Sequence, residues 1–74
     1  MKELQDELKG LMATADYFNG VHTEVYKLGI FSDDYIRKIR QGVRDFKDTP
    51  KNRNKVYQLI IAYETRLHKL KQLI

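Results

Sequence analysis

The sequence predicts a small all-α domain of four helices, in which the second and third form a helix-turn-helix and the last is long. Apolar residues recur three and four positions apart in several segments, which is the spacing of amphipathic helices. No segment alternates apolar and polar residues with a period of two, so no strand is expected. With 74 residues, 42% of them hydrophobic, there is room for one small core, and we expect a single domain over residues 1–74.

The first helix is expected from about Lys2 to Tyr17. Its apolar face is formed by residues alternately four and three positions apart, namely Leu4, Leu8, Leu11, Ala15 and Phe18. Asn19 and Gly20 follow, and both residue types tolerate the left-handed backbone that ends many helices. We therefore expect the first helix to end just before this pair.

A short second helix is expected to begin at Val21 and to be closed by Gly29. Val21, Val25 and Leu28 repeat the spacing of four and three, and Gly29 offers the free backbone that a tight turn into another helix needs. In a helix-turn-helix the third helix packs across the second. Val25 and Leu28 are therefore expected to contact the apolar side of the third helix.

The third helix is expected to begin after Ser32 and to end near Gly42. The Ser32 hydroxyl is suited to cap the first turn, and the carboxylates of Asp33 and Asp34 lie favourably at the positive end of the helix dipole. Its inward side consists of Tyr35, Ile36 and Ile39. The basic residues between these positions are then expected to face outward.

The fourth helix is expected from about Pro50 to Leu73, with Thr49 as its N-cap. Its apolar stripe, expected to pack on the first helix, consists of Val56, Ile60, Tyr63, Leu67, Leu70 and Ile74. Three more apolar residues lie off this stripe, and these are Leu59, Ile61 and Leu73. Their exposure would leave apolar surface uncovered, so we expect the protein to form a homodimer.

Charge is distributed unevenly along the chain, whose net charge is +4. Residues 36–55 contain eight basic and two acidic residues, a net charge of +6, whereas residues 1–35 contain three basic and seven acidic residues. A basic segment on an otherwise acidic or mixed chain is typical of a protein that binds a polyanion.

Several kinds of site are not expected. The chain has no cysteine, which excludes disulfides and thiolate metal centres, and His22 and His68 have no partner at metal-ligand spacing. No glycine-rich phosphate loop and no nucleophile–base pair is visible. We therefore expect no enzyme activity, no metal, no other cofactor and no small-molecule substrate.

A cytoplasmic location without a membrane partner is also expected. The N-terminal residues carry a charge every few positions and so lack the continuous apolar stretch of a signal peptide. No later segment is long and apolar enough to be expected to span a membrane.

The segment EVYKLGIFSDDYIRKIRQGVRD, residues 24–45, resembles the helix-turn-helix of the phage-repressor (Cro-like) family of DNA-binding proteins. The matching positions are Val25, Gly29, Ile30, Ser32, Tyr35, Ile36, Ile39, Gly42 and Arg44. Phe31 makes the turn one residue longer than is usual in the family. The resemblance implies a small phage- or mobile-element-type transcriptional regulator, such as a repressor, that binds sequence-specifically to double-stranded DNA with its third helix in the major groove.

The same resemblance implies which residues contact DNA. The candidates for base contacts are Ser32, Asp34, Arg37, Lys38 and Gln41. Arg37 is the best candidate for guanine, because a guanidinium matches its O6 and N7 acceptors, and Gln41 is suited to adenine. The candidates for phosphate contacts, which set the register without reading sequence, are Arg40, Arg44, Lys47, Lys51, Arg53 and Lys55.

Two other functions stay open at this point. A small, basic, cytoplasmic helical bundle is similar to the bacteriocin immunity proteins, which would imply a protein or membrane partner. Structured RNA is another polyanion that a basic segment of this kind would attract. Both alternatives keep the all-α fold and differ from the DNA-binding regulator in the partner that is bound.

Overall fold

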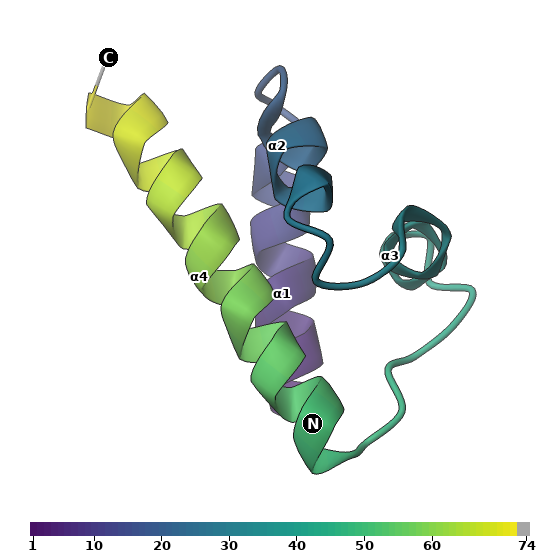
Figure 1. Cartoon of the computed structure of the whole chain (residues 1–74). Coiled ribbons are helices and arrows are strands. Elements are labelled where there is room, and N and C mark those ends of the chain that lie inside the picture. The colour runs from purple at the N-terminus through teal and green to yellow at the C-terminus, as the bar shows by residue number, and fades with distance from the viewer. Residues whose placement is uncertain (73–74) are drawn as a thin grey trace.

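The computed structural model describes residues 1–72, which form four helices and no strand (Figure 1). The helices are α1 (Lys2–Ala15), α2 (Val21–Lys27), α3 (Asp33–Arg40) and α4 (Pro50–Gln72). The predicted all-α class, the order of the helices and the long last helix are thereby confirmed. The predicted contribution of Leu73 and Ile74 to the last helix lies outside the described residues.

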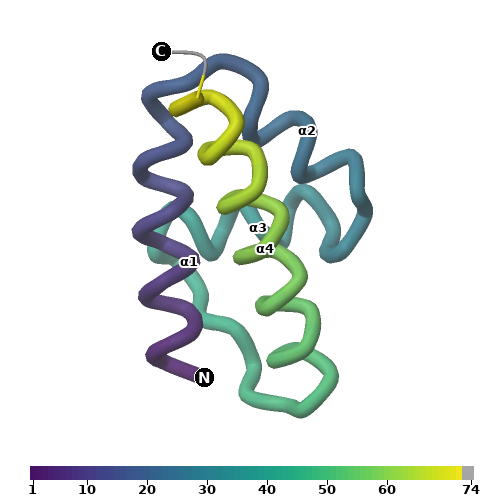
Figure 2. Tube along the Cα trace, turned by 90° about the vertical axis from the view of Figure 1, so that its left-hand side faces the viewer, coloured from purple at the N-terminus to yellow at the C-terminus, as the bar shows by residue number. Residues whose placement is uncertain are grey.

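Helices α1 and α4 lie side by side and run in the same direction (Figures 1 and 2). Helices α2 and α3 lie together against one side of this pair, and α3 crosses it (Figure 2). The connection from α3 to α4 then returns the chain to the end at which α1 begins (Figure 1). The two segments of the predicted helix-turn-helix are therefore carried on a scaffold of two parallel helices.

The two predicted caps are present. The Tyr35 backbone N–H donates to the Ser32 hydroxyl over 3.3 Å, and the Asn52 backbone N–H donates to the Thr49 hydroxyl over 3.1 Å. Each bond satisfies a first-turn N–H that has no partner within its own helix. These two bonds fix where α3 and α4 begin.

The core lies between α1 and α4 and extends to α2 and α3. The predicted stripes supply much of it, since the side chains of Leu8, Ala15, Val56, Ile60, Tyr63 and Leu67 are buried. The prediction that Leu59 lies exposed off the stripe is wrong, because its side chain is fully buried. Helix α2 packs on α4 in addition to α1, so α4 buries a broader face than a seam with one partner requires. Ile61, by contrast, is 61% exposed, as predicted.

The predicted packing of Leu28 against the third helix is also wrong. Helix α2 ends at Lys27, and Leu28 lies in the turn that follows, with 51% of its surface exposed. The backbone of Gly29 has a φ of +67°, so the chain changes direction directly after Leu28. Val25 remains on the inward side and belongs to the same buried cluster as Ile36 and Ile39.

Gln5 attaches the connection between α3 and α4 to α1. Its Nε2 donates to Asp45 over 2.7 Å, and its Oε1 accepts from the backbone N–H of Phe46 over 2.8 Å. Gln5 is 6% exposed, and Phe46 belongs to the core. A buried polar side chain 40 positions away in sequence therefore holds a connection that has no helix or strand of its own.

We expect Gln5→Leu to lower the free energy of unfolding by about 1–3 kcal/mol, the cost of a buried N–H left without an acceptor, here that of Phe46. Urea denaturation measures this difference. The matched control is Asp45→Asn, which keeps an oxygen that accepts from Gln5 and leaves the bond from Phe46 in place. Equal stability of Gln5→Leu and the wild-type protein would contradict the role assigned to Gln5.

Candidate nucleic-acid interface

Helix α3 presents its polar residues to solvent because its two large aliphatic residues face the core. Ile36 and Ile39 are 1% and 0% exposed. All five residues predicted to contact bases are exposed, and these are Ser32, Asp34, Arg37, Lys38 and Gln41. The amphipathic spacing therefore put each of them on the outer side of α3 or at its ends.

Three of these five side chains already have partners. The Ser32 hydroxyl accepts the capping bond from Tyr35. Lys38 Nζ lies 3.1 Å from an oxygen of Asp34, one helical turn away, so the two charges compensate each other. Within residues 1–72, the side chains of Arg37 and Gln41 make no hydrogen bond or ion pair. Of the five candidates, Arg37 and Gln41 are thus the least engaged with the rest of the protein.

The predicted phosphate contacts divide into paired and unpaired cations. Arg53 donates to both oxygens of Asp48, over 2.7 and 3.1 Å, and this bond holds the pKa of Asp48 below its ordinary value. Arg40 is bound to Asp16. The other four have no carboxylate partner within the described part of the chain, and these are Arg44, Lys47, Lys51 and Lys55. The free positive charge of the segment is therefore smaller than its sequence indicates.

An aromatic cluster, formed by Phe31, Tyr35 and Phe46, supports two of these unpaired cations. The rings of Phe31 and Tyr35 are stacked, with centroids 5.2 Å apart and planes 17° apart, and Phe46 lies 5.1 Å from Phe31. Arg44 lies over the Tyr35 ring at 4.6 Å, and Lys55 lies over the Phe31 ring at 5.1 Å. A ring face attracts a cation without neutralising it, so both charges remain available to an anion.

This aromatic cluster was not predicted from the sequence. Phe31 was recognisable only as the extra residue in the turn, and its stacking on Tyr35 explains what that residue does. The spacing of Phe31 and Tyr35, four positions apart across the start of a helix, is a signal that would have placed the two rings together. Phe46 reaches these rings because the connection between α3 and α4 returns to the core, and no local sequence pattern indicates that return.

A shallow groove lies between α2 and α3 and continues the basic surface. Its lining residues are His22, Thr23, Tyr26, Lys27, Asp33, Arg37 and Arg40. Lys27 was not singled out from the sequence because it lies outside the basic segment, on the preceding helix. In the structure it shares this groove with Arg37. The candidate interface therefore extends from the connection between α3 and α4, across α3, to the last residue of α2.

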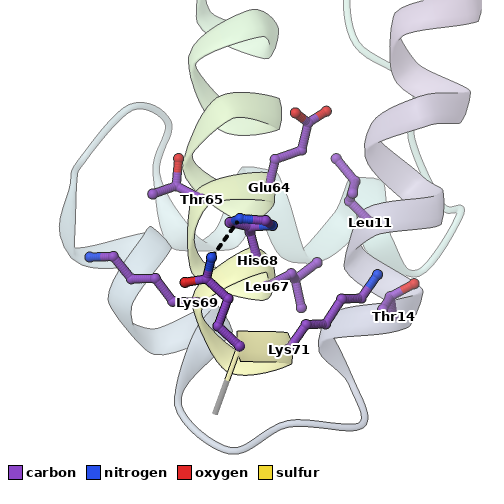
Figure 3. A pocket seen from close by; sticks show the side chains of 9 residues that line it. Leu11, Thr14, Glu64, Thr65, Leu67, His68, Lys69 and Lys71 are labelled. Atoms are coloured by element: carbon purple, nitrogen blue, oxygen red, sulfur yellow. Dashed lines mark hydrogen bonds between the residues drawn. The ribbon is translucent and has the colours of Figure 1, made fainter. Parts of the chain in front are cut away.

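A second hollow is lined by residues of α1 and α4 alone. This hollow, shown in Figure 3, lies beside the last turns of α4, faces Leu11 and Thr14 of α1, and contains the bond between His68 and Gln72. Within residues 1–72 there is no group of three histidine or carboxylate side chains that could hold a metal ion. The same residues include no helix with the length and apolar character needed to cross a membrane.

The resemblance to the phage-repressor family concerns residues 24–45, and the helices α2 and α3 lie within or across that range. Membership of that family stays a prediction. Comparison of the chain with protein-family models, with curated proteins and with solved structures finds no match.

Proposed function

We propose that this protein is a sequence-specific double-stranded DNA-binding protein that acts in the cytoplasm as a small transcriptional regulator of the phage or mobile-element type. Helix α3 enters the major groove in this proposal, and the connection between α3 and α4, together with the first turns of α4, contacts the phosphates. The observation that carries the proposal is the position of five cations without carboxylate partners in the described residues: Arg37, Arg44, Lys47, Lys51 and Lys55.

Two further features support DNA as the anion. Helix α3 lies across the scaffold with only its inner side buried, so its outer side is open to a groove wide enough for a helix. Gln41 is the C-cap of α3 and follows Arg37 by four positions, so the two lie on the same side. Their side chains carry the donor patterns that suit guanine and adenine.

Two single variants should distinguish base reading from phosphate binding by their effects on the preferred site and on random DNA. Arg37→Ala should cost about 1–3 kcal/mol on the preferred site and little on random DNA, because one bidentate contact to guanine is lost. Lys51→Ala should weaken binding to the preferred site and binding to random DNA about equally, because every duplex offers the same phosphates. The preferred site is obtained by selection from a random duplex pool with the wild-type protein, and both variants are titrated on it and on random duplex.

The outcome of this comparison decides the role of α3. If the two variants lose the same affinity on both duplexes, α3 does not read bases. A wild-type protein that leaves random duplex unbound at micromolar concentration and low salt removes the DNA proposal altogether. The same titrations give the number of protomers on each duplex, and two on a palindromic site are expected from the proposed homodimer.

The second candidate is a helical binding module for a protein or membrane partner, as similarity to the bacteriocin immunity proteins would imply. The observation that favours it is an exposed apolar pair on α4, where Tyr57 is 53% and Ile61 is 61% exposed. These residues lie four positions apart and therefore on the same face. This candidate gains support if duplex DNA is not bound.

A further inference from the structure

We propose that Asp16 fixes the orientation of α3 and thereby determines how well the protein distinguishes its preferred sequence from random DNA. The inference rests on the proposed function and adds a positioning residue that lies outside the basic segment. A hydrogen-bonded group joins all four helices; it is here called the Asp16 network and consists of Asp16, His22, Tyr26, Arg40 and Tyr63.

The centre of the Asp16 network is one carboxylate oxygen. Asp16 follows the last residue of α1, and its Oδ1 accepts from Arg40 Nη2 over 2.7 Å and from His22 Nε2 over 2.7 Å. Arg40 is the last residue of α3, and His22 belongs to α2. The end of α3 is therefore tied through one carboxylate to both preceding helices.

Two tyrosines complete the network. Arg40 Nη1 donates to the Tyr26 hydroxyl of α2 over 3.1 Å. The Tyr63 hydroxyl lies 2.8 Å from His22 Nδ1, and the Tyr63 side chain is fully buried in α4. Since Arg40 contacts α1 and α2 directly and α4 through His22, its guanidinium has a fixed place in the fold.

The protonation states of the network are consistent with each other. Burial raises the pKa of Tyr63 above its ordinary value, so its hydroxyl stays protonated and can donate to His22 Nδ1. The other ring nitrogen, Nε2, then carries the proton donated to Asp16. That hydrogen bond, together with the charge of Arg40, holds the pKa of Asp16 below its ordinary value. The carboxylate is therefore ionised at neutral pH.

Helix α3 needs such an attachment because it is short and is buried through few side chains. It has eight residues, of which Ile36 and Ile39 are buried. Contacts between aliphatic side chains are not directional, so they hold the helix against the core but define its rotation weakly. The bonds of Arg40 to Asp16 and Tyr26 are directional and charge-assisted.

Rotation of α3 matters to recognition because Arg37 lies one turn before Arg40. A bidentate contact to a base edge tolerates only small errors in position and angle. Contacts between exposed lysines and phosphates tolerate larger errors, because a single ammonium on a long side chain acts as a point charge. Loss of the Asp16 network should therefore reduce discrimination more than overall affinity.

The experiment compares Asp16→Ala with Glu24→Ala. Glu24 is the matched control because it also pairs with an arginine, Arg66 of α4, over 3.1 Å, and that pair does not involve α3. Each variant removes one exposed carboxylate and frees one guanidinium, so each adds the same charge. Both should bind random duplex at least as tightly as the wild-type protein at low salt, and Asp16→Ala should gain more, because the arginine it frees, Arg40, lines the candidate interface.

The ratio of affinities for the selected site and for random duplex should differ between the two variants. We expect Glu24→Ala to keep the wild-type ratio and Asp16→Ala to lower it about tenfold, within the range for one lost base contact. Amide hydrogen exchange, measured without DNA, gives a second readout. Exchange should become faster across α3 in Asp16→Ala and stay at the wild-type rate there in Glu24→Ala, with α1 and α4 equally protected in both.

The possible failures can be told apart. Equal ratios in the two variants, with DNA binding by the wild-type protein intact, overturn the role of Asp16 and leave the proposed function standing. Equal exchange rates across α3 in the two variants also overturn it, because they show that Asp16 does not hold the helix. If the wild-type protein binds no duplex, the proposed function fails and the inference fails with it. Loss of protection in all helices of Asp16→Ala would show that Asp16 stabilises the whole fold, and this too would overturn its proposed role in orienting α3.

Discussion

Raising the salt concentration from about 50 mM to about 200 mM should weaken binding to random duplex by roughly two to three powers of ten. Each lysine or arginine that neutralises a phosphate releases a counterion, which contributes about −0.9 to the slope of log K against log salt. If the four unpaired phosphate candidates reach phosphates, the slope is about −4. Gel-shift or fluorescence-anisotropy titrations of one duplex at several salt concentrations measure it.

The pairing seen in the structure makes this prediction specific. Lys47→Ala should lower the magnitude of the slope by about one, because Lys47 has no carboxylate partner in the described residues. Arg53→Ala is the matched control: Asp48 already neutralises Arg53, so the slope should stay close to the wild-type value. A slope near zero for the wild-type protein, or equal effects of the two variants, would contradict the assignment of the phosphate contacts.

The fold was predictable because its determinants are local. Spacings of three and four identify the helices, and Ser32 and Thr49 mark two of their starts through hydrogen bonds to residues three positions away. Where the prediction failed, the cause was not local. Leu59 is buried because α4 is covered by α2 as well as by α1, and periodicity within α4 carries no information on how many helices pack against it.

The candidate site was predictable only in its composition. The basic residues and the outward positions of α3 follow from charge and helical spacing. Which of these charges stay unpaired does not follow from charge and spacing, because it depends on the partners that the fold brings near them. Arg40 meets Asp16 from 24 positions away, and Arg44 is held by the ring of Tyr35. The sequence therefore identified which cations were candidates, and the structure indicated which of them are available.

Replacing Ile39 with aspartate should unfold the protein and abolish binding to selected and random duplex alike. Ile39 is 0% exposed within the cluster that joins α3 to the core. A carboxylate there would lose its hydration inside an apolar cluster, at a cost of several kcal/mol. A domain of this size is expected to have little stability to spare. Circular dichroism and urea denaturation measure the loss of helix.

The matched control is Gln41→Asp, which introduces the same carboxylate two positions later, at the exposed residue that ends α3. It should leave the helical signal and the urea midpoint close to wild type, with a small loss from a negative charge near the C-terminal end of a helix. DNA binding should nevertheless fall, because this carboxylate would face the bases and phosphates that the outer side of α3 is proposed to approach. Strong DNA binding by folded Gln41→Asp would show that α3 does not enter the groove, whereas a folded Ile39→Asp protein would show that α3 is not anchored through Ile39.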